Sequence, residues 1–140
     1  MKPTRQLHEL GQSLWLDNIT RTLLDDGTLA GYIERFSITG LTSNPTIFQH
    51  ALAEGDAYDA DIASAPSERS TEQLFIDLAL ADLTRAADLF QPIHERTVGM
   101  DGWVSMEISP LLADDARGSV EAAQRIHARG IEGARQALQH

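Results

Sequence analysis

Cysteine is absent from the 140-residue sequence, which excludes disulfides, thiolate metal sites and a cysteine nucleophile. Lysine is nearly absent as well, since Lys2 is the only one. Lysine and arginine together number 11 against 21 aspartates and glutamates, which gives a formal net charge of −10. Such a chain repels phosphate backbones and anionic lipid surfaces, so we expect neither nucleic acid nor a membrane surface as a partner.

Long hydrophobic runs are also missing. Apolar stretches such as Leu78–Ala81 are too short to cross a bilayer, and Met1–Gln12 is polar and lacks the apolar core of a signal peptide. The sequence contains no phosphate-binding loop, no Gly-x-Gly-x-x-Gly motif, no His-Glu-x-x-His zinc motif and no Gly-x-Ser-x-Gly nucleophile elbow. We therefore expect a cytoplasmic chain without a nucleotide site or a metal site.

Short extended segments alternate with longer helical ones along the rest of the chain. Three apolar runs are typical of buried strands, and each ends in polar residues: Ser13–Asn18, Ile38–Asn44 and Gly102–Ser109. Helical spacing or capping residues predict helices over Ile19–Asp26, Thr28–Phe36, Pro45–Ala53 and Ser70–Pro92, and a last helix opened by Asp114 and Asp115. Gly55–Ser70 reads as a loop. Strands separated by helical crossovers indicate an α/β fold with a parallel sheet.

Each predicted strand brings one polar side chain to its carboxyl end, where parallel sheets gather their functional residues. These are Asp17, Asn44 and Glu107. Asp17 has an alternative role as the N-cap of the helix that follows Asn18, because aspartate is a favoured capping residue. Asn44 has an alternative role in an Asn-Pro turn that opens a helix. A glutamate inside a sheet covered on both faces must be paired or functional, which favours a site role for Glu107.

Trp15 and Trp103 lie inside the strand candidates. We expect both side chains in the core rather than at a ligand platform.

Three segments of the chain resemble transaldolase, in the form found in bacteria such as actinobacteria and cyanobacteria. They are Gly11–Asn18, Gly40–Phe48 and Val104–Ala113, and they occur in the family's order at plausible spacing. With the helices between them they span roughly Thr4–Arg129. The resemblance argues against an unrelated small α/β domain.

The resemblance implies a fold and a domain organisation. The family is a class I aldolase-type (β/α)₈ barrel, so this chain is expected to be a partial TIM barrel of about three β-α units. All of residues 1–140 then form a single N-terminal segment, with residues 130–140 outside the family pattern.

The resemblance also implies an activity in the pentose phosphate pathway. The family moves a dihydroxyacetone unit from sedoheptulose 7-phosphate to glyceraldehyde 3-phosphate, with erythrose 4-phosphate and fructose 6-phosphate as further sugar phosphates. It uses a lysine Schiff base and needs no metal or organic cofactor. By resemblance, Asp17 handles protons on the substrate hydroxyl, and Asn44 positions the donor's hydroxyls and the intermediate. Glu107 acts through a water in carbinolamine formation and breakdown.

The Schiff-base lysine has no counterpart in this chain. The family carries it on the next strand, whereas this sequence continues as a helical or loose segment from Arg129 to His140. Lys2 lies in a polar N-terminal stretch before the first strand, so we do not expect it to substitute. The arginines and serine that grip the substrate phosphate come later in the family.

The sequence therefore predicts an incomplete product, from a truncated or frameshifted gene or a fragmentary gene model, that is inactive alone. Open edges of its sheet would invite association. The alternative is a non-catalytic relative that associates with another chain or binds sugar phosphate.

Overall fold

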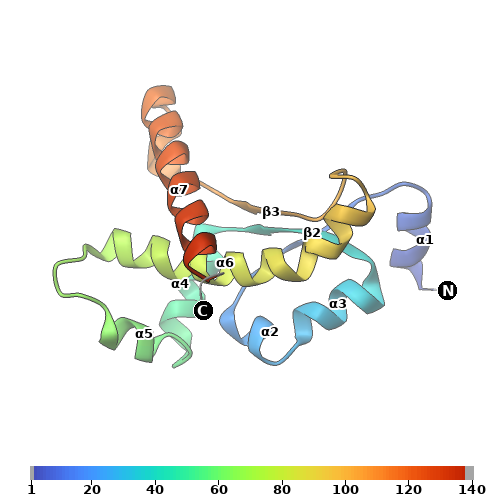
Figure 1. Cartoon of the computed structure of the whole chain (residues 1–140), viewed down its shortest axis with the longest axis horizontal. Coiled ribbons are helices and arrows are strands. Elements are labelled where there is room, and N and C mark those ends of the chain that lie inside the picture. The colour runs from blue at the N-terminus through green and yellow to red at the C-terminus, as the bar shows by residue number, and fades with distance from the viewer. Residues whose placement is uncertain (1, 138–140) are drawn as a thin grey trace.

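The computed structural model describes the backbone of residues 2–137, and their side chains apart from those of residues 54 and 132–137 (Figure 1). The elements along the chain are α1 (Pro3–Glu9), β1 (Leu14–Asp17), α2 (Arg21–Asp25), α3 (Thr28–Phe36), β2 (Ile38–Ser43), α4 (Pro45–Glu54), α5 (Asp59–Ser64), α6 (Thr71–Arg96), β3 (Trp103–Met106), the 3₁₀ helix η1 (Pro110–Leu112) and α7 (Ala116–Ala137). Each of the three predicted strands is present, and each is shorter than its predicted range.

The three strands form one parallel sheet in the order β1-β2-β3. Asp17 pairs with Thr42 at the end of β1, and Thr42 pairs in turn with Ser105. Ser43 pairs with Met106 at the end of β3. The strands therefore end together, and the parallel sheet that the alternating pattern predicted is confirmed. In the described part of the chain the sheet is open rather than closed into a barrel.

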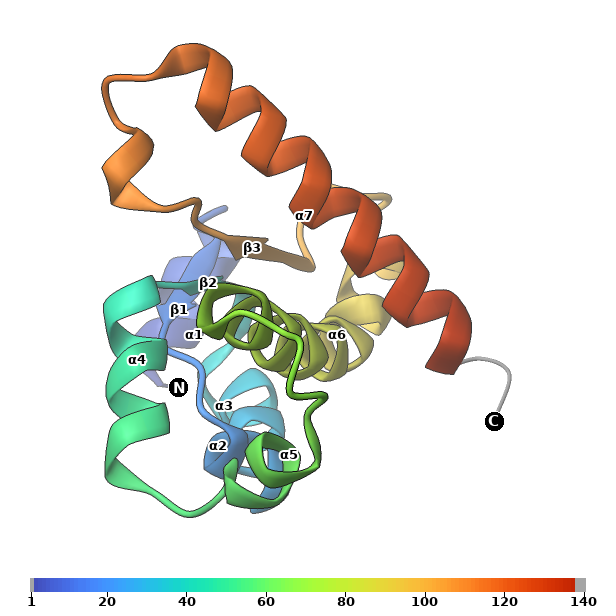
Figure 2. The same cartoon turned by 90° about the vertical axis from the view of Figure 1, so that its left-hand side faces the viewer.

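One face of the sheet is covered by α2, α3 and α6 (Figure 2). α6 presents Leu83, Ala86, Phe90 and Ile93 from one side, because residues three and four apart share a face of a helix. These side chains pack with buried residues of α3 and β2 and with partly buried residues of all three strands: Leu29, Leu41, Leu16, Ile38, Val104 and Met106. The core thus fixes the strands from one side only.

α6 begins as the sequence predicts. The Ser70 hydroxyl accepts a hydrogen bond from the Gln73 amide, and the Gln73 side chain accepts one from the Ser70 amide. This capping box satisfies two amides that the first helical turn leaves free. The predicted end at Pro92 is wrong, because the helix continues to Arg96. Asp88 and Pro92 are exposed, so water can hydrate the Asp88 carbonyl, which proline leaves without a donor.

Two short helices lie where the sequence predicted none. α1 occupies the polar N-terminal stretch, and α5 lies inside the segment expected to be a loop. Residues 130–137 form the last part of α7 and are helical, which is one of the two forms predicted for the segment after Arg129. Residues 138–140 of the same prediction lie outside the described residues. None of the helices described is both long enough and apolar enough to span a bilayer.

Candidate functional site

Alternation along the strands divides their side chains between two faces of the sheet. Leu16, Leu41 and Met106 point to the helices and belong to the core or pack against it. The positions between them form the opposite face, which we call the open face: Trp15 and Asp17 of β1, Gly40 and Thr42 of β2, and Trp103 and Ser105 of β3. Asn44 and Glu107 continue the series just past the ends of β2 and β3.

The open face is built in layers across the three strands. Gly40 pairs with both Trp15 and Trp103 and forms the first layer. Asp17, Thr42 and Ser105 are in register and form the second layer. Asn44 and Glu107 form the third, about 7 Å further along, because two residues of a strand advance about 6.6 Å. The three predicted site residues therefore come from adjacent strands at one edge and belong to one face.

Asp17 is not the helix cap that its sequence position allowed. Thr20 caps α2 instead, with its hydroxyl accepting a hydrogen bond from the Leu23 amide at 3.2 Å. The Asp17 side chain is exposed. Its carboxylate is therefore left available to a ligand on the open face.

Asn44 does cap a helix, as the Asn-Pro pattern indicated. Its side-chain oxygen accepts a hydrogen bond from the Thr46 amide at 2.8 Å, and Pro45 occupies the first turn of α4. The cap uses the oxygen and leaves the two amide N–H donors of Asn44 for another partner. Capping fixes the side chain in one orientation, which is compatible with a second role at the site.

A small cavity lies at this edge, beneath Asn44 and Glu107. Its volume is about 10 Å³, and Ser43, Phe48 and Met106 also line it. Most of its lining is apolar and Met106 packs toward the helices, so the cavity lies on the covered side of the sheet and offers a water few polar partners. Glu107 itself is exposed. Within the described residues, no cluster of three or more histidines, aspartates or glutamates is arranged to hold a metal ion.

The two tryptophans are not core residues in this chain, which corrects the expectation from sequence. Trp15 is 43% exposed and Trp103 is 51% exposed. The Trp15 ring lies directly over Gly40, where an added Cβ would come within 2.5 Å of it. Trp103 is partly covered, because the His94 ring of α6 packs edge-on against it with ring centres 4.7 Å apart.

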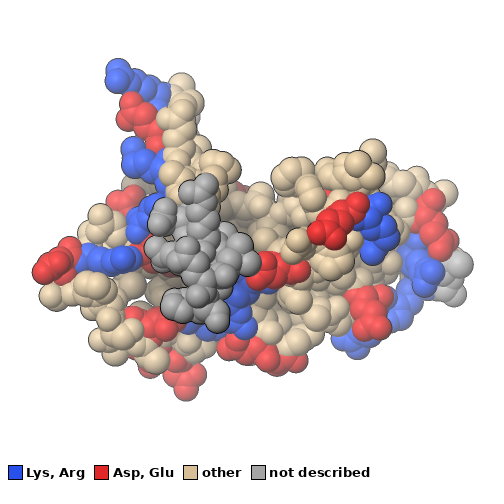
Figure 3. Space-filling model, in the orientation of Figure 1, with Lys and Arg blue, Asp and Glu red and all other residues tan. Residues whose placement is uncertain are grey.

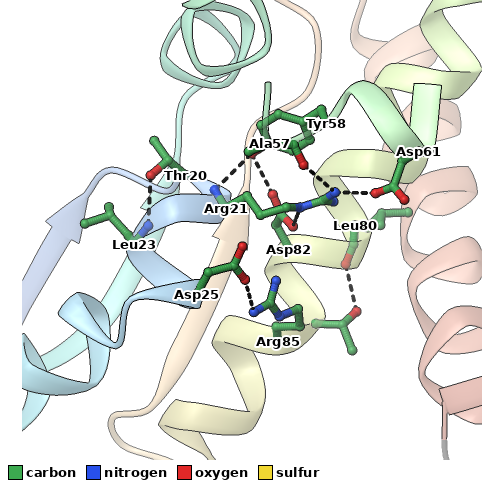
Figure 4. A network of polar contacts seen from close by, with 11 residues as sticks. Thr20, Arg21, Leu23, Asp25, Ala57, Tyr58, Asp61, Leu80, Asp82 and Arg85 are labelled. Atoms are coloured by element: carbon green, nitrogen blue, oxygen red, sulfur yellow. Dashed lines mark hydrogen bonds and ion pairs between the residues drawn. The ribbon is translucent and has the colours of Figure 1, made fainter. Parts of the chain in front are cut away.

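A buried polar network holds the segments that follow β1 and β2 against α6 (Figure 4). The Arg21 guanidinium donates to the Asp82 carboxylate at 2.9 Å, pairs with Asp61 and donates to the Ala57 carbonyl. The Tyr58 hydroxyl donates to the other Asp82 oxygen at 2.7 Å and accepts from the Arg21 amide at 3.0 Å. Arg21 lies four residues after Asp17, so the network anchors the turn that leaves the site.

Burial governs the protonation of this network. The Asp82 side chain is 0% exposed and that of Arg21 is 12% exposed. Burial lowers the pKa of Arg21, but its hydrogen bonds and charge interactions with Asp61 and Asp82 outweigh this effect and raise the pKa above its usual value. Burial, with the hydrogen bond to Asp82, raises the pKa of Tyr58 well above 10. Arg21 therefore stays charged, and Tyr58 stays protonated, at neutral pH.

Sequence reasoning missed Thr42, Ser105 and the network. Thr42 and Ser105 lie two residues before Asn44 and Glu107 on the open face, so strand alternation could have identified them. The network joins positions 21, 58 and 82, and no local pattern connects residues so far apart in the chain.

Lys2 lies at the opposite end of the sheet from the predicted site residues. Its ammonium group is 4.6 Å from the centre of the Phe36 ring, and Phe36 ends α3 just before β2 begins. Figure 1 shows α1 at the amino ends of the strands, whereas α4 and α7 follow their carboxyl ends. The geometry thus agrees with the expectation that Lys2 does not serve this site.

Comparison with known proteins decides which family this arrangement belongs to. Residues 14–135 match the family described as Transaldolase/Fructose-6-phosphate aldolase, which is most of the chain and includes all three strands. The chain belongs to the transaldolase family. The match ends inside the segment 130–140 that sequence analysis set outside the family pattern, so that boundary stays a prediction.

Individual transaldolases agree with the family match. The transaldolase of Thiobacillus denitrificans is 45% identical over 127 residues, which cover 90% of this chain and 35% of that protein. The transaldolase of Neisseria gonorrhoeae is 46% identical over 121 residues, covering 85% of this chain and 34% of that protein. The transaldolase of Trichodesmium erythraeum is 37% identical over 123 residues, which cover 87% of this chain and 32% of that protein. The chain thus spans about a third of the length of the curated relatives it matches.

Proposed function

We propose that the carboxyl edge of this sheet contributes to a transaldolase reaction, which moves a dihydroxyacetone unit from sedoheptulose 7-phosphate to glyceraldehyde 3-phosphate. One observation carries the proposal: in a member of this family, Asp17, Asn44 and Glu107 come from three adjacent parallel strands and belong to one open face at one edge. Active sites of (β/α)₈ barrels are built at this edge.

The proposed roles follow from the chemistry of each group. A lysine amine adds to the ketone, water leaves, and the resulting iminium accepts the electron pair of the carbon–carbon bond that breaks. The exposed Asp17 carboxylate takes the proton from the hydroxyl that becomes the departing aldehyde. The amide N–H donors of Asn44 hold the donor's hydroxyl groups. Glu107 moves protons through a water as the carbinolamine forms and breaks down.

The amine has to come from polypeptide beyond these residues, because Lys2 is held at the other end of the sheet against Phe36. This position of Lys2 favours a second candidate function for the chain alone. In that case the chain binds sugar phosphate without turnover or associates with another chain.

A chimera tests the proposed function. Residues 14–129 of this chain replace the matching segment of the Thiobacillus denitrificans transaldolase, and transfer from sedoheptulose 7-phosphate to glyceraldehyde 3-phosphate is measured. The chimera should be active, and Asp17→Asn should lower kcat by about 10²- to 10⁴-fold, the usual contribution of a positioned acid–base group. The exposed Glu34 of α3 provides a control, since Glu34→Gln should change nothing. A folded but inactive chimera would favour the non-catalytic alternative.

A further inference from the structure

Buried groups rather than exposed charges stand out in the rest of the molecule. Figure 3 shows acidic and basic side chains mixed over one face, without a large patch of either sign. Tyr58 is only 1% exposed, and the proposed reaction gives it no role. Its hydroxyl donates to the Asp82 carboxylate of α6 at 2.7 Å and accepts from the Arg21 amide of α2 at 3.0 Å. The hydroxyl therefore ties the start of α2 to α6.

The Arg21 amide needs a partner outside its own helix. Arg21 is the first residue of α2, and the first amides of a helix have no carbonyl one turn earlier to bond. The Thr20 hydroxyl accepts from the Leu23 amide, and the Tyr58 hydroxyl accepts from the amide of Arg21. Because α2 is only five residues long, these two bonds fix where it begins.

The turn between β1 and α2 has Asp17 at its first position and Arg21 at its last. Asp17 pairs with Thr42 in the sheet, and Ile19 in the middle of the turn is buried in the core. The Tyr58 hydroxyl holds the far end. The Asp17 side chain is itself exposed, so its direction follows from the backbone that these contacts hold.

The Tyr58 ring is held independently of its hydroxyl. It packs edge-on against the buried Phe48 ring of α4, with ring centres 5.5 Å apart. The guanidinium carbon of Arg21 lies 4.4 Å from the centre of the same ring. The ring thus contacts the helix that Asn44 caps, while the hydroxyl bonds the helix that follows Asp17. Removing the hydroxyl alone should leave the ring and α4 in place.

We propose that Tyr58 is a positioning residue, whose hydroxyl, bonded to Asp82, holds the turn after β1 so that the Asp17 carboxylate meets the substrate hydroxyl. This inference rests on the proposed function, because it concerns the proton that Asp17 takes. Tyr58 acts only through Asp17, since its own side chain is buried against Leu78 and Ala79 of α6. Misplacing a reacting group by about 1 Å can slow a reaction by about 10²-fold.

The chimera that contains residues 14–129 of this chain separates positioning from general stability. Tyr58→Phe removes the hydroxyl and keeps the ring against Phe48. Thr97→Val is the matched control at the amino end of β3, where the Thr97 hydroxyl also makes two bonds: it donates to the Ile93 carbonyl and accepts from the Asp101 amide, each at 2.9 Å. Transfer from sedoheptulose 7-phosphate gives kcat and KM. Borohydride trapping of dihydroxyacetone reports adduct formation alone, because that step breaks no carbon–carbon bond.

We expect Tyr58→Phe to lower kcat for transfer by about tenfold or more and to leave KM and the trapping rate unchanged. Asp17→Asn with Tyr58→Phe should be as slow as Asp17→Asn alone, because no carboxylate is then left to position. Thr97→Val should keep the parent kcat. In the 140-residue chain, Tyr58→Phe should also speed the hydrogen exchange of the Arg21 amide, which loses its acceptor.

Several results would overturn the proposal. They are a parent kcat in Tyr58→Phe, equal losses in Tyr58→Phe and Thr97→Val, a further loss when Tyr58→Phe is added to Asp17→Asn, or unchanged exchange of the Arg21 amide. Failure of the proposed function looks different, since Asp17→Asn would then keep the parent kcat. A slow Asp17→Asn variant beside a Tyr58→Phe variant at the parent rate contradicts the positioning role alone.

Discussion

Removing Asp82 should destabilise the chain more than any change to an exposed ion pair. The Asp82→Ala variant leaves the Tyr58 hydroxyl without its acceptor and the buried Arg21 guanidinium without its 2.9 Å partner. Asp61 remains beside Arg21, but its side chain is 51% exposed and compensates little. Among the carboxylates drawn in Figure 4, only that of Asp82 is fully buried, and this variant removes it.

The expected size of the effect follows from burial. Breaking a buried ion pair by removing one partner costs about 3–5 kcal/mol, because the other charge is left uncompensated. Native domains are stable by only about 5–15 kcal/mol, so Asp82→Ala should remove a large share of the total. The double variant Arg21→Met with Asp82→Leu removes both charges and should recover most of that loss.

Urea denaturation followed by circular dichroism measures the free energy of unfolding of each variant. The control is the exposed pair of Arg85 with Asp25, whose side chains are 45% and 55% exposed. Asp25→Ala should cost at most about 1 kcal/mol, the usual worth of a surface ion pair. An Asp82→Ala cost no larger than that of Asp25→Ala, or a double variant as unstable as the single one, would refute the reasoning.

Three further predictions concern the core, a turn and the pH dependence of stability. Phe90 is fully buried against the sheet, so Phe90→Ala should cost about 3–5 kcal/mol in urea titrations, whereas the partly exposed neighbour Leu89 should tolerate alanine far better. Gly102 has a φ of +83°, and a Cβ added there would clash with the His94 backbone. Gly102→Ala should therefore lower the melting temperature by several degrees, at about 2–4 °C for each 1 kcal/mol lost in a domain of roughly 150 residues. Burial and the hydrogen bond to Asp82 raise the pKa of Tyr58 above about 10, the pKa of an unfolded tyrosine. The contribution of Tyr58 to the free energy of unfolding should therefore stay constant below about pH 10 and should fall as the pH rises above it. Urea midpoints between pH 9 and 11 should show this fall in the parent chain and a smaller one in Tyr58→Phe; parallel curves would contradict the assignment.

The sequence predicted the parts of this fold that depend on local patterns. Apolar runs ending in Asp17, Asn44 and Glu107 indicated the strands, and capping residues such as Ser70 indicated where helices begin. The hydrophobic spacing of α3 matched its observed range of Thr28–Phe36. These features were predictable because strand burial and helix capping depend on residues close together in the chain.

Other features depend on contacts that local patterns do not encode. α5 forms in a segment rich in loop residues, where the preceding Tyr58 is buried against Phe48 with ring centres 5.5 Å apart. The exposure of Trp15 and Trp103 follows from an open face, whereas the sequence suggested a sheet covered on both sides. Even the cap of α2 required the structure, because Asp17 and Thr20 are both good capping residues and only Thr20 has the cap geometry.

The borohydride-trapped adduct of the chimera tests the site most directly. The amount of fructose 6-phosphate carbon bound covalently to the protein is followed by mass spectrometry in the parent chimera, in Glu107→Gln and in the control Glu34→Gln. If the open face works as proposed, Glu107→Gln slows adduct formation by about 10²-fold or more, and Glu34→Gln forms the adduct at the parent rate. Equal rates in all three proteins would contradict the claim that the carboxyl edge of this sheet takes part in the reaction.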